Sequence, residues 1–181
     1  MKKIDVLDGG YVIIHKDGMM GSDLTIVNSA KVSYGKRTNK LSEKDLGLID
    51  FLAREGHTSP FRHATLQFEI KMPLMIARQH WKYIVGSTWQ DPMVAWNESS
   101  RRYITERNEF HLPEWFREAP ENSKQGSGPP VSEEINERYI NLLAQHQLRG
   151  EALYQQAMAD NICPEQARLF VSAYGMYVSF Y

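Results

Sequence analysis

Seven consecutive residues carry most of the groups in this chain that could bind a small charged ligand. Segment 97–103 is Asn-Glu-Ser-Ser-Arg-Arg-Tyr, which presents an amide, a carboxylate, two hydroxyls, two guanidinium groups and a phenol. Guanidinium groups bind phosphate through paired hydrogen bonds, serine hydroxyls donate to the same oxygens, and a carboxylate accepts from a sugar hydroxyl. The segment therefore indicates a nucleoside monophosphate site. Because so short a motif is unspecific, a solvated polar loop is its simplest explanation until the context is considered.

The composition restricts the classes of protein to which the chain can belong. It has 181 residues, 42% of them hydrophobic, and 21 Lys+Arg against 22 Asp+Glu, which is typical of a globular protein with a single domain. A net charge of -1 lacks the broad positive field that polynucleotide binding needs. No run approaches the roughly 20 apolar residues of a membrane span, and the single cysteine, Cys163, cannot form an internal disulfide. We expect one cytoplasmic domain over 1–181 that binds neither polynucleotide nor membrane.

Strands are expected in the first half of the chain. The turn residues at 8–10 precede an apolar run that is typical of a strand. Alternation of apolar and polar residues over 65–71 predicts a half-buried strand in which residues such as Leu66 and Phe68 face the core. Pro73 is typical of a first helical turn, so the pattern predicts that a helix follows it directly.

Helices are expected mainly in the second half. Capping and apolar periodicity predict helices over 42–56 and 132–159, and Pro164 is typical of the start of another. The Pro, Gly, Ser and Asn content of 119–131 predicts a mobile surface loop. Strands early and helices late indicate an α+β protein.

Four other segments supply the context that the polar motif needs. Together with the motif 97–103, these segments occur in the same order as in the flavin-dependent thymidylate synthases, also called thymidylate synthase-complementing proteins, and the chain resembles that family. The resemblance runs from about Ala30 to Arg168, and the motifs are specific in combination. It implies an α+β fold with a central, mostly antiparallel sheet and flanking helices. The four segments are Ala-Lys-Val-Ser-Tyr-Gly (30–35), Gly-His-Thr-Ser-Pro-Phe-Arg-His (56–63), Arg-Gln-His-Trp-Lys-Tyr-Ile-Val-Gly-Ser (78–87) and Pro-Glu-Gln-Ala-Arg (164–168).

The resemblance also implies an activity. Similar proteins are homotetramers that bind FAD, take a one-carbon unit from methylenetetrahydrofolate, use NADPH to reduce the flavin, and convert dUMP to dTMP. Each of their sites collects residues from several subunits, so closeness along the chain says little about closeness in space. The chain is therefore expected to be a methyltransferase, a flavoprotein that serves nucleotide biosynthesis.

The same resemblance assigns residues to the two ligands. Ser100 and Arg168 are the candidate catalytic residues, and Ser100 is assigned to phosphate binding because no residue is visibly placed to deprotonate it. Cys163 lies outside the site segments, so the reaction depends on the hydride of the reduced flavin and on activation of uracil by guanidinium groups. FAD would be lined by Ser33, His57, Ser59, Arg78 and the helix end at Lys82. dUMP would be held by Gln79, Ser87, Glu98, Ser100, Arg102 and Arg168.

The chain departs from the family pattern at three places. Lys82-Tyr83-Ile84 stands where the family shows Arg-His-Arg, which replaces two polar side chains near flavin and folate. Nine residues, 88–96, stand between Ser87 and Asn97 where the family has one, so eight residues (88–95) are inserted. The longer segment contains Trp89 and Trp96, and for both we favour packing, for example against a neighbouring subunit, over stacking on folate. Similar proteins also continue past the position that matches Tyr181. We therefore expect a truncated C-terminus, with the aromatic residues of its uncharged ending packed in a subunit core.

These departures leave two alternatives to the enzyme. The first is an incomplete or non-catalytic relative that binds nucleotide or flavin, and the second is a variant that delivers a hydroxymethyl group to dUMP. No metal is expected, because His57, His63 and His80 lack the spacing of a ligand set and no cysteine accompanies them. Arg101 is expected to be a solvated or interface charge.

Overall fold

The computed structural model of the chain describes residues 2–87, 96–121 and 126–181. These residues form two compact units, which are described separately. The first unit comprises the start of the chain up to Lys3 together with Ile13–Glu69. The second unit comprises Ile4–Val12 and Ile70–Tyr181.

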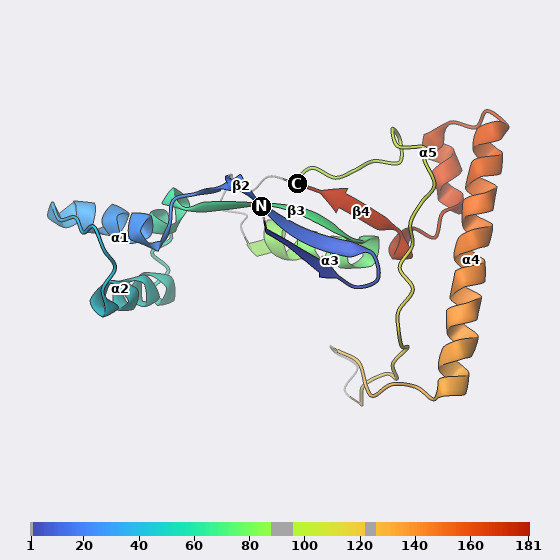
Figure 1. Cartoon of the computed structure of the whole chain (residues 1–181), viewed down its shortest axis with the longest axis horizontal. Coiled ribbons are helices and arrows are strands. Elements are labelled where there is room, and N and C mark those ends of the chain that lie inside the picture. The colour runs from blue at the N-terminus through green and yellow to red at the C-terminus, as the bar shows by residue number, and fades with distance from the viewer. Residues whose placement is uncertain (1, 88–95, 122–125) are drawn as a thin grey trace. The chain divides into compact units, whose positions relative to one another are not determined.

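Four strands form one sheet, and the chain order of the strands is also their order in the sheet. Residues 7–9 connect the first two strands and include the turn that the sequence predicts. In the second unit, β3 and β4 run antiparallel with a register from Ile70↔Phe180 to Pro73↔Tyr177. The prediction of an α+β fold on a mostly antiparallel sheet with flanking helices is confirmed (Figure 1). The strands are β1 (Lys2–Val6), β2 (Gly10–Met20), β3 (Thr65–Pro73) and β4 (Tyr177–Phe180).

Two helices of the first unit, α1 (Asp23–Lys31) and α2 (Glu43–Arg54), are joined by a buried ion pair. Asp45 of α2 has a side chain only 6% exposed and accepts a hydrogen bond from the Lys31 ammonium. That bond, followed by those from Ser42, lowers the pKa of Asp45 to about 2. Ser42 and Asp45 also form the capping box that begins α2, as expected from the sequence. Helix α1 was not expected, because it is short and its apolar residues follow no strong period.

The predicted strand at 65–71 is present, and its predicted buried face is covered only in part. Ile70 packs against the core of the second unit, whereas Leu66 is 62% exposed and Phe68 is 38% exposed. The prediction was wrong for Leu66 and Phe68, because period-2 alternation shows that a face is apolar but does not show what covers it.

The second unit contains the larger core. Tyr154 of α4 (Glu133–Ala159) is fully buried, and α4 and α5 (Pro164–Ala167) pack together, as Figure 1 shows. Ser132 caps α4 by accepting from the backbone N–H of Ile135 at 3.4 Å, so the predicted long helix and its cap are confirmed. The remaining buried members of this core are Ala77, Ala157, Ala167, Val171, Met176, Val178 and Phe180.

Two expectations about side chains near β4 have definite outcomes. Trp96 stacks on Phe180 with ring centroids 4.2 Å apart and 19° between the planes, so the favoured packing role of Trp96 is confirmed. Pro73 ends β3 and does not lie in the helix, because it pairs with Tyr177 of β4. The helix α3 (Leu74–Ser87) begins one residue later. Proline fits the last strand position because it has no N–H to leave unpaired.

Two predicted features fall partly or wholly outside the described residues. The insertion 88–95, with Trp89, lies outside them, as do residues 122–125 of the predicted loop. On either side of residues 122–125, Glu118 is joined to residues 128–129 by backbone hydrogen bonds. The N–H of Glu118 donates to the carbonyl of Pro129 at 2.9 Å, and the N–H of Gly128 donates to the carbonyl of Glu118 at 2.8 Å.

Candidate functional site

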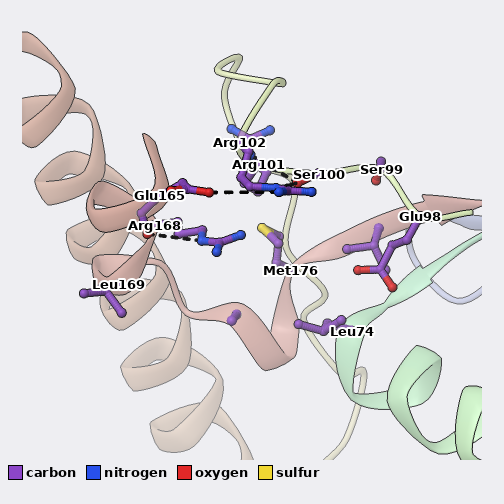
Figure 2. A pocket seen from close by; sticks show the side chains of 12 residues that line it. Leu74, Glu98, Ser99, Ser100, Arg101, Arg102, Glu165, Arg168, Leu169 and Met176 are labelled. Atoms are coloured by element: carbon purple, nitrogen blue, oxygen red, sulfur yellow. Dashed lines mark hydrogen bonds and ion pairs between the residues drawn. The ribbon is translucent and has the colours of Figure 1, made fainter. Parts of the chain in front are cut away.

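The second unit contains a cavity of about 590 Å³ that brings together four of the predicted site residues (Figure 2). These are Glu98, Ser100, Arg102 and Arg168. They come from two parts of the chain that are distant in sequence, the polar motif and the end of α5 with the turn η3 (Arg168–Phe170). The cavity is also lined by Leu74, Ser99, Arg101, Glu165, Leu169, Ala173, Met176 and Val178.

Pairing with β4 holds the polar motif in place. Asn97 and Tyr181 exchange backbone hydrogen bonds of 3.0 and 2.8 Å, and the N–H of Ser99 donates to the carbonyl of Ser179 at 2.7 Å. The N–H of Ser179 donates in turn to Ser99 Oγ at 3.0 Å. Segment 97–99 therefore extends the sheet along the edge of β4, and the motif turns into the cavity at the next residue, Ser100.

Arg102 is the exposed cation of this motif. Its Nε donates to Ser100 Oγ at 3.2 Å, and its guanidinium carbon lies 5.0 Å from the centre of the Tyr103 ring. Its Nη1 lies 4.0 Å from Glu165 Oε1, with the Arg102 side chain 46% exposed. Ser100 and Arg102 thus present a hydroxyl and a guanidinium side by side, which is the donor arrangement that phosphate accepts.

Arg168, which directly follows α5, supplies a second guanidinium to the cavity. Its Nε donates to the backbone carbonyl of Glu165 at 3.2 Å, across the short helix α5. Met176, Val178 and Leu74 provide apolar surface in the same cavity. The arrangement of cations beside apolar side chains suits a ligand that has an anionic group and a flat, weakly polar ring.

Arg101 is not the solvated charge that was one of the two expectations from the sequence, and the other, an interface charge, stays a prediction. Arg101 lines the cavity, donates a hydrogen bond from Nη2 to the carbonyl of Glu106, and lies 5.5 Å over the ring of the buried Tyr154. Its Nε is buried with no hydrogen-bond partner within the described part of the chain. Stacking on an aromatic ring from α4 gives this arginine a packing partner that no local motif reveals.

Two predicted dUMP residues are not placed in this cavity. Gln79 is exposed on α3 and does not line it. Ser87 is the last residue of α3, and its side chain lies outside the described residues.

The predicted FAD residues lie on both units and are all exposed. Arg78 and Lys82 lie on α3 in the second unit, where the guanidinium of Arg78 is 5.8 Å from the centre of the Trp81 ring. The hydroxyls, the imidazole and the cations of this set have the donor chemistry that the phosphates of a dinucleotide accept. In the first unit, Ser33 lies in η1 (Val32–Tyr34), His57 lies just after α2, and Ser59 begins η2 (Ser59–His63).

A second polar cluster, which no sequence motif indicated, joins Asp8, His111 and Tyr177. One carboxylate oxygen of Asp8 accepts from the Tyr177 hydroxyl at 2.5 Å and lies 2.5 Å from His111 Nδ1, and the other accepts from the Leu112 N–H at 3.0 Å. Burial alone would raise the pKa of Asp8, but the hydrogen bonds from Leu112, Tyr177 and His111 outweigh it and lower the pKa to about 2. Burial and the bond to Asp8 raise the pKa of Tyr177.

Comparison with known proteins places the chain in a family. The profile of the thymidylate synthase complementing proteins matches residues 16–181. The chain belongs to this family. Among curated relatives, flavin-dependent thymidylate synthases from Thermus thermophilus and Thermosipho africanus are 35% and 31% identical to it over 178 and 176 residues. These alignments cover 98% and 97% of this chain but 60% and 72% of the two relatives, so the chain spans about 60% of the length of the Thermus protein.

Solved structures agree with the fold of this thymidylate synthase complementing protein. A UMP/dUMP methylase, PolB from Streptomyces cacaoi, bound with 5-Br dUMP, superposes with a TM-score of 0.74 and 23% identity. The superposition covers 98% of this chain and 73% of PolB.

Neither a metal site nor a membrane helix is found in the part of this family member that the structure describes. Over 2–87, 96–121 and 126–181, no three or more His, Cys, Asp or Glu side chains are grouped as metal ligands would be. No helix in the same residues is long and apolar enough to span a bilayer.

Proposed function

We propose that this chain acts as a flavin-dependent thymidylate synthase, which converts dUMP to dTMP with methylenetetrahydrofolate as carbon donor and NADPH as reductant through FAD. The observation that carries the proposal is the cavity in which Ser100 and Arg102 of one motif meet Arg168 of another. Membership of the thymidylate synthase complementing family supplies the reaction class.

The cavity residues would bind dUMP through its phosphate, sugar and base. Arg102 and the Ser100 hydroxyl beside it would hold the phosphate, since their separation of 3.2 Å lets both donate to one anion. Glu98 would accept from a sugar hydroxyl. Arg168 would stabilise negative charge that develops on the uracil ring, which is the electrostatic role of a fixed guanidinium in a partly enclosed site. Gln79 and Ser87 complete the proposed set.

The exposed donors outside the cavity would hold FAD, which when bound supplies the hydride chemistry of the reaction. Ser33 and Ser59 would contribute hydroxyl donors, and His57 would contribute an imidazole donor. Arg78 and Lys82 would contribute positive charge beside the phosphates. None of the five is assigned a proton transfer, so their role is to bind and orient.

We further propose that the working form is a cytoplasmic homotetramer with shared sites, as the family resemblance implies. Leu66 and Phe68 lie two residues apart on β3 and are both exposed, and this supports assembly because apolar side chains that gather on a surface are typical of a site of protein association. In a tetramer, this face would be covered by another copy.

The visible spectrum tests flavin binding and substrate binding in one experiment. We expect the purified chain, incubated with FAD and freed of excess, to show flavin absorption bands that change on addition of dUMP. Tritium release from labelled dUMP, with NADPH and methylenetetrahydrofolate, then measures turnover. A colourless protein that neither takes up FAD nor binds dUMP would contradict the proposal.

One observation in the sequence favours testing for two alternatives, a non-catalytic relative and a variant that transfers a hydroxymethyl group. Lys82-Tyr83-Ile84 replaces the family's Arg-His-Arg and changes the polar groups proposed to lie near flavin and folate. Flavin and dUMP binding without tritium release would identify a non-catalytic relative. A product heavier than dTMP by one oxygen would identify a hydroxymethylating variant.

A further inference from the structure

We infer that Glu165 restricts the nucleotide cavity to monophosphates, because it places a carboxylate against the outer side of the arginine that binds phosphate. The inference rests on the proposed function, since it assumes that a uridine nucleotide binds here with its phosphate on Arg102. It assigns to Glu165 a role in specificity that the proposed dUMP contacts do not include.

Glu165 is held between the two exposed arginines of the cavity. Its Oε1 lies 4.0 Å from Arg102 Nη1, and its backbone carbonyl accepts from Arg168 Nε at 3.2 Å (Figure 2). The residue follows Pro164 in α5, so its backbone is fixed at the start of a helical turn. Its side chain is 62% exposed and lines the cavity, which leaves the carboxylate beside the guanidinium that we assign to phosphate.

Among its described residues, the cavity has as many acids as exposed cations. Arg101 is engaged by the Glu106 carbonyl and the Tyr154 ring, which leaves Arg102 and Arg168 as the cations that an incoming anion meets. Glu98 and Glu165 oppose them with two negative charges.

The pair of Arg102 with Glu165 is weak enough to open for a substrate. Both side chains are substantially exposed and 4.0 Å apart, a geometry in which solvent screens most of the attraction. A dianionic phosphate therefore competes successfully for the guanidinium. A second or third phosphate would add charge beside the displaced carboxylate with no further exposed cation among the described cavity residues to offset it. Solvent screens this repulsion as it screens the ion pair, so the discrimination depends on the several charges of a longer phosphate chain and is largest at low ionic strength.

A purely structural role for Glu165 predicts a different result. As an acid in the first turn of α5, Glu165 could stabilise that turn, and its loss would then lower the melting temperature and weaken all nucleotides equally. A specificity role changes the ratio of affinities between nucleotides and leaves the fold unchanged.

The test measures dissociation constants of the full 181-residue chain for dUMP, dUDP and dUTP by titration calorimetry at low ionic strength, in EDTA. The variants are Glu165→Gln, Glu165→Asp and the control Glu137→Gln, which removes one negative charge from an exposed position on α4. We expect the wild-type chain to bind dUMP at least tenfold more tightly than dUTP. Glu165→Gln should reduce this ratio five- to tenfold, mainly through tighter dUTP binding, whereas Glu165→Asp and Glu137→Gln should largely preserve it.

The outcomes separate the two proposals. An unchanged ratio in Glu165→Gln, an equal change in the control, or a wild-type chain without preference for dUMP would overturn the specificity role while dUMP binding stands. Failure of the wild-type chain to bind any of the three nucleotides would overturn the proposed function itself.

Discussion

The cavity around Arg102 and the cluster around Asp8 lie in the same unit and both contain charged side chains, but their hydrogen bonding differs. Asp8 accepts from a tyrosine hydroxyl and a backbone N–H at 2.5 and 3.0 Å, with His111 at 2.5 Å. Arg102 bonds to its neighbour Ser100 and otherwise makes a 4.0 Å ion pair.

This difference distinguishes a polar group that stabilises the fold from one that is available to a ligand. The partners of Asp8 lie far away in sequence, at His111 and Tyr177, so the carboxylate joins the β1–β2 turn to β4 and to the segment before α4. The partners of Arg102 lie within its own motif or on an exposed acid. A cation with so few competing contacts keeps its donors for an incoming anion.

The largest effect is expected on dUMP affinity, from a substitution in the cavity around Arg102. Arg102→Ala should weaken dUMP binding 30- to 100-fold, equivalent to about 2–3 kcal/mol for the loss of hydrogen bonds to a charged group. The melting temperature should stay the same, because the side chain is 46% exposed. Calorimetric titration and thermal unfolding measure the two effects. Arg149→Ala, at an exposed position on α4, is the matched control and should change neither.

Tyr177→Phe is expected to lower the stability of the fold and to leave the affinity for dUMP nearly unchanged. Loss of the hydroxyl removes the hydrogen bond to Asp8 and leaves the Gly9 N–H, which donates to it at 3.1 Å, without its partner. The free energy of unfolding should fall by about 1–2 kcal/mol, while the affinity for dUMP should change less than twofold. Urea unfolding measures the first and titration the second. Tyr174→Phe, at a tyrosine 72% exposed, should be neutral, and a comparable loss there would argue against the cluster.

The smallest effect concerns acid stability. The pKa of Asp8 is about 2 in the folded chain against an ordinary value of 3.8, so its stabilising contribution is present above about pH 4 and is lost as the pH falls towards 2. Because the side chain is 40% exposed, solvent screening reduces this contribution to about 1 kcal/mol. Wild type and Asp8→Asn should therefore differ in urea unfolding at pH 5 and converge near pH 2. A constant difference across this range, or the same convergence in the exposed-site control Asp50→Asn, would contradict the assignment.

Features that depend on neighbours in sequence could be predicted. The capping box of Ser42 with Asp45 and the cap at Ser132 each lie within one helical turn. Residue type and spacing were therefore enough to predict where α2 and α4 begin. The same holds for Ser100 and Arg102, two residues apart, whose contact is local.

Features that depend on distant partners could not be predicted. Asp8 and Tyr177 are separated by 169 positions, and nothing in either local segment indicates the other. Arg101 was misjudged for the same reason, because Tyr154, over which it stacks, lies on α4. The uncharged C-terminal segment suggested burial of its aromatic residues, which holds for Tyr177 and Phe180 but not for the exposed Tyr174 and Tyr181. The pairing of this segment with β3 required the three-dimensional structure.

The pairing of segment 97–99 with β4 has a consequence for how the protein is made. Ser99 and Ser179 are 80 positions apart, so the polar motif 97–103 leaves the ribosome long before the strand that holds it. Pairings of this sequence separation form late, because a long loop must close before they stabilise anything. A nascent chain therefore carries the complete motif before the cavity exists, and the cavity is completed only when β4 has docked.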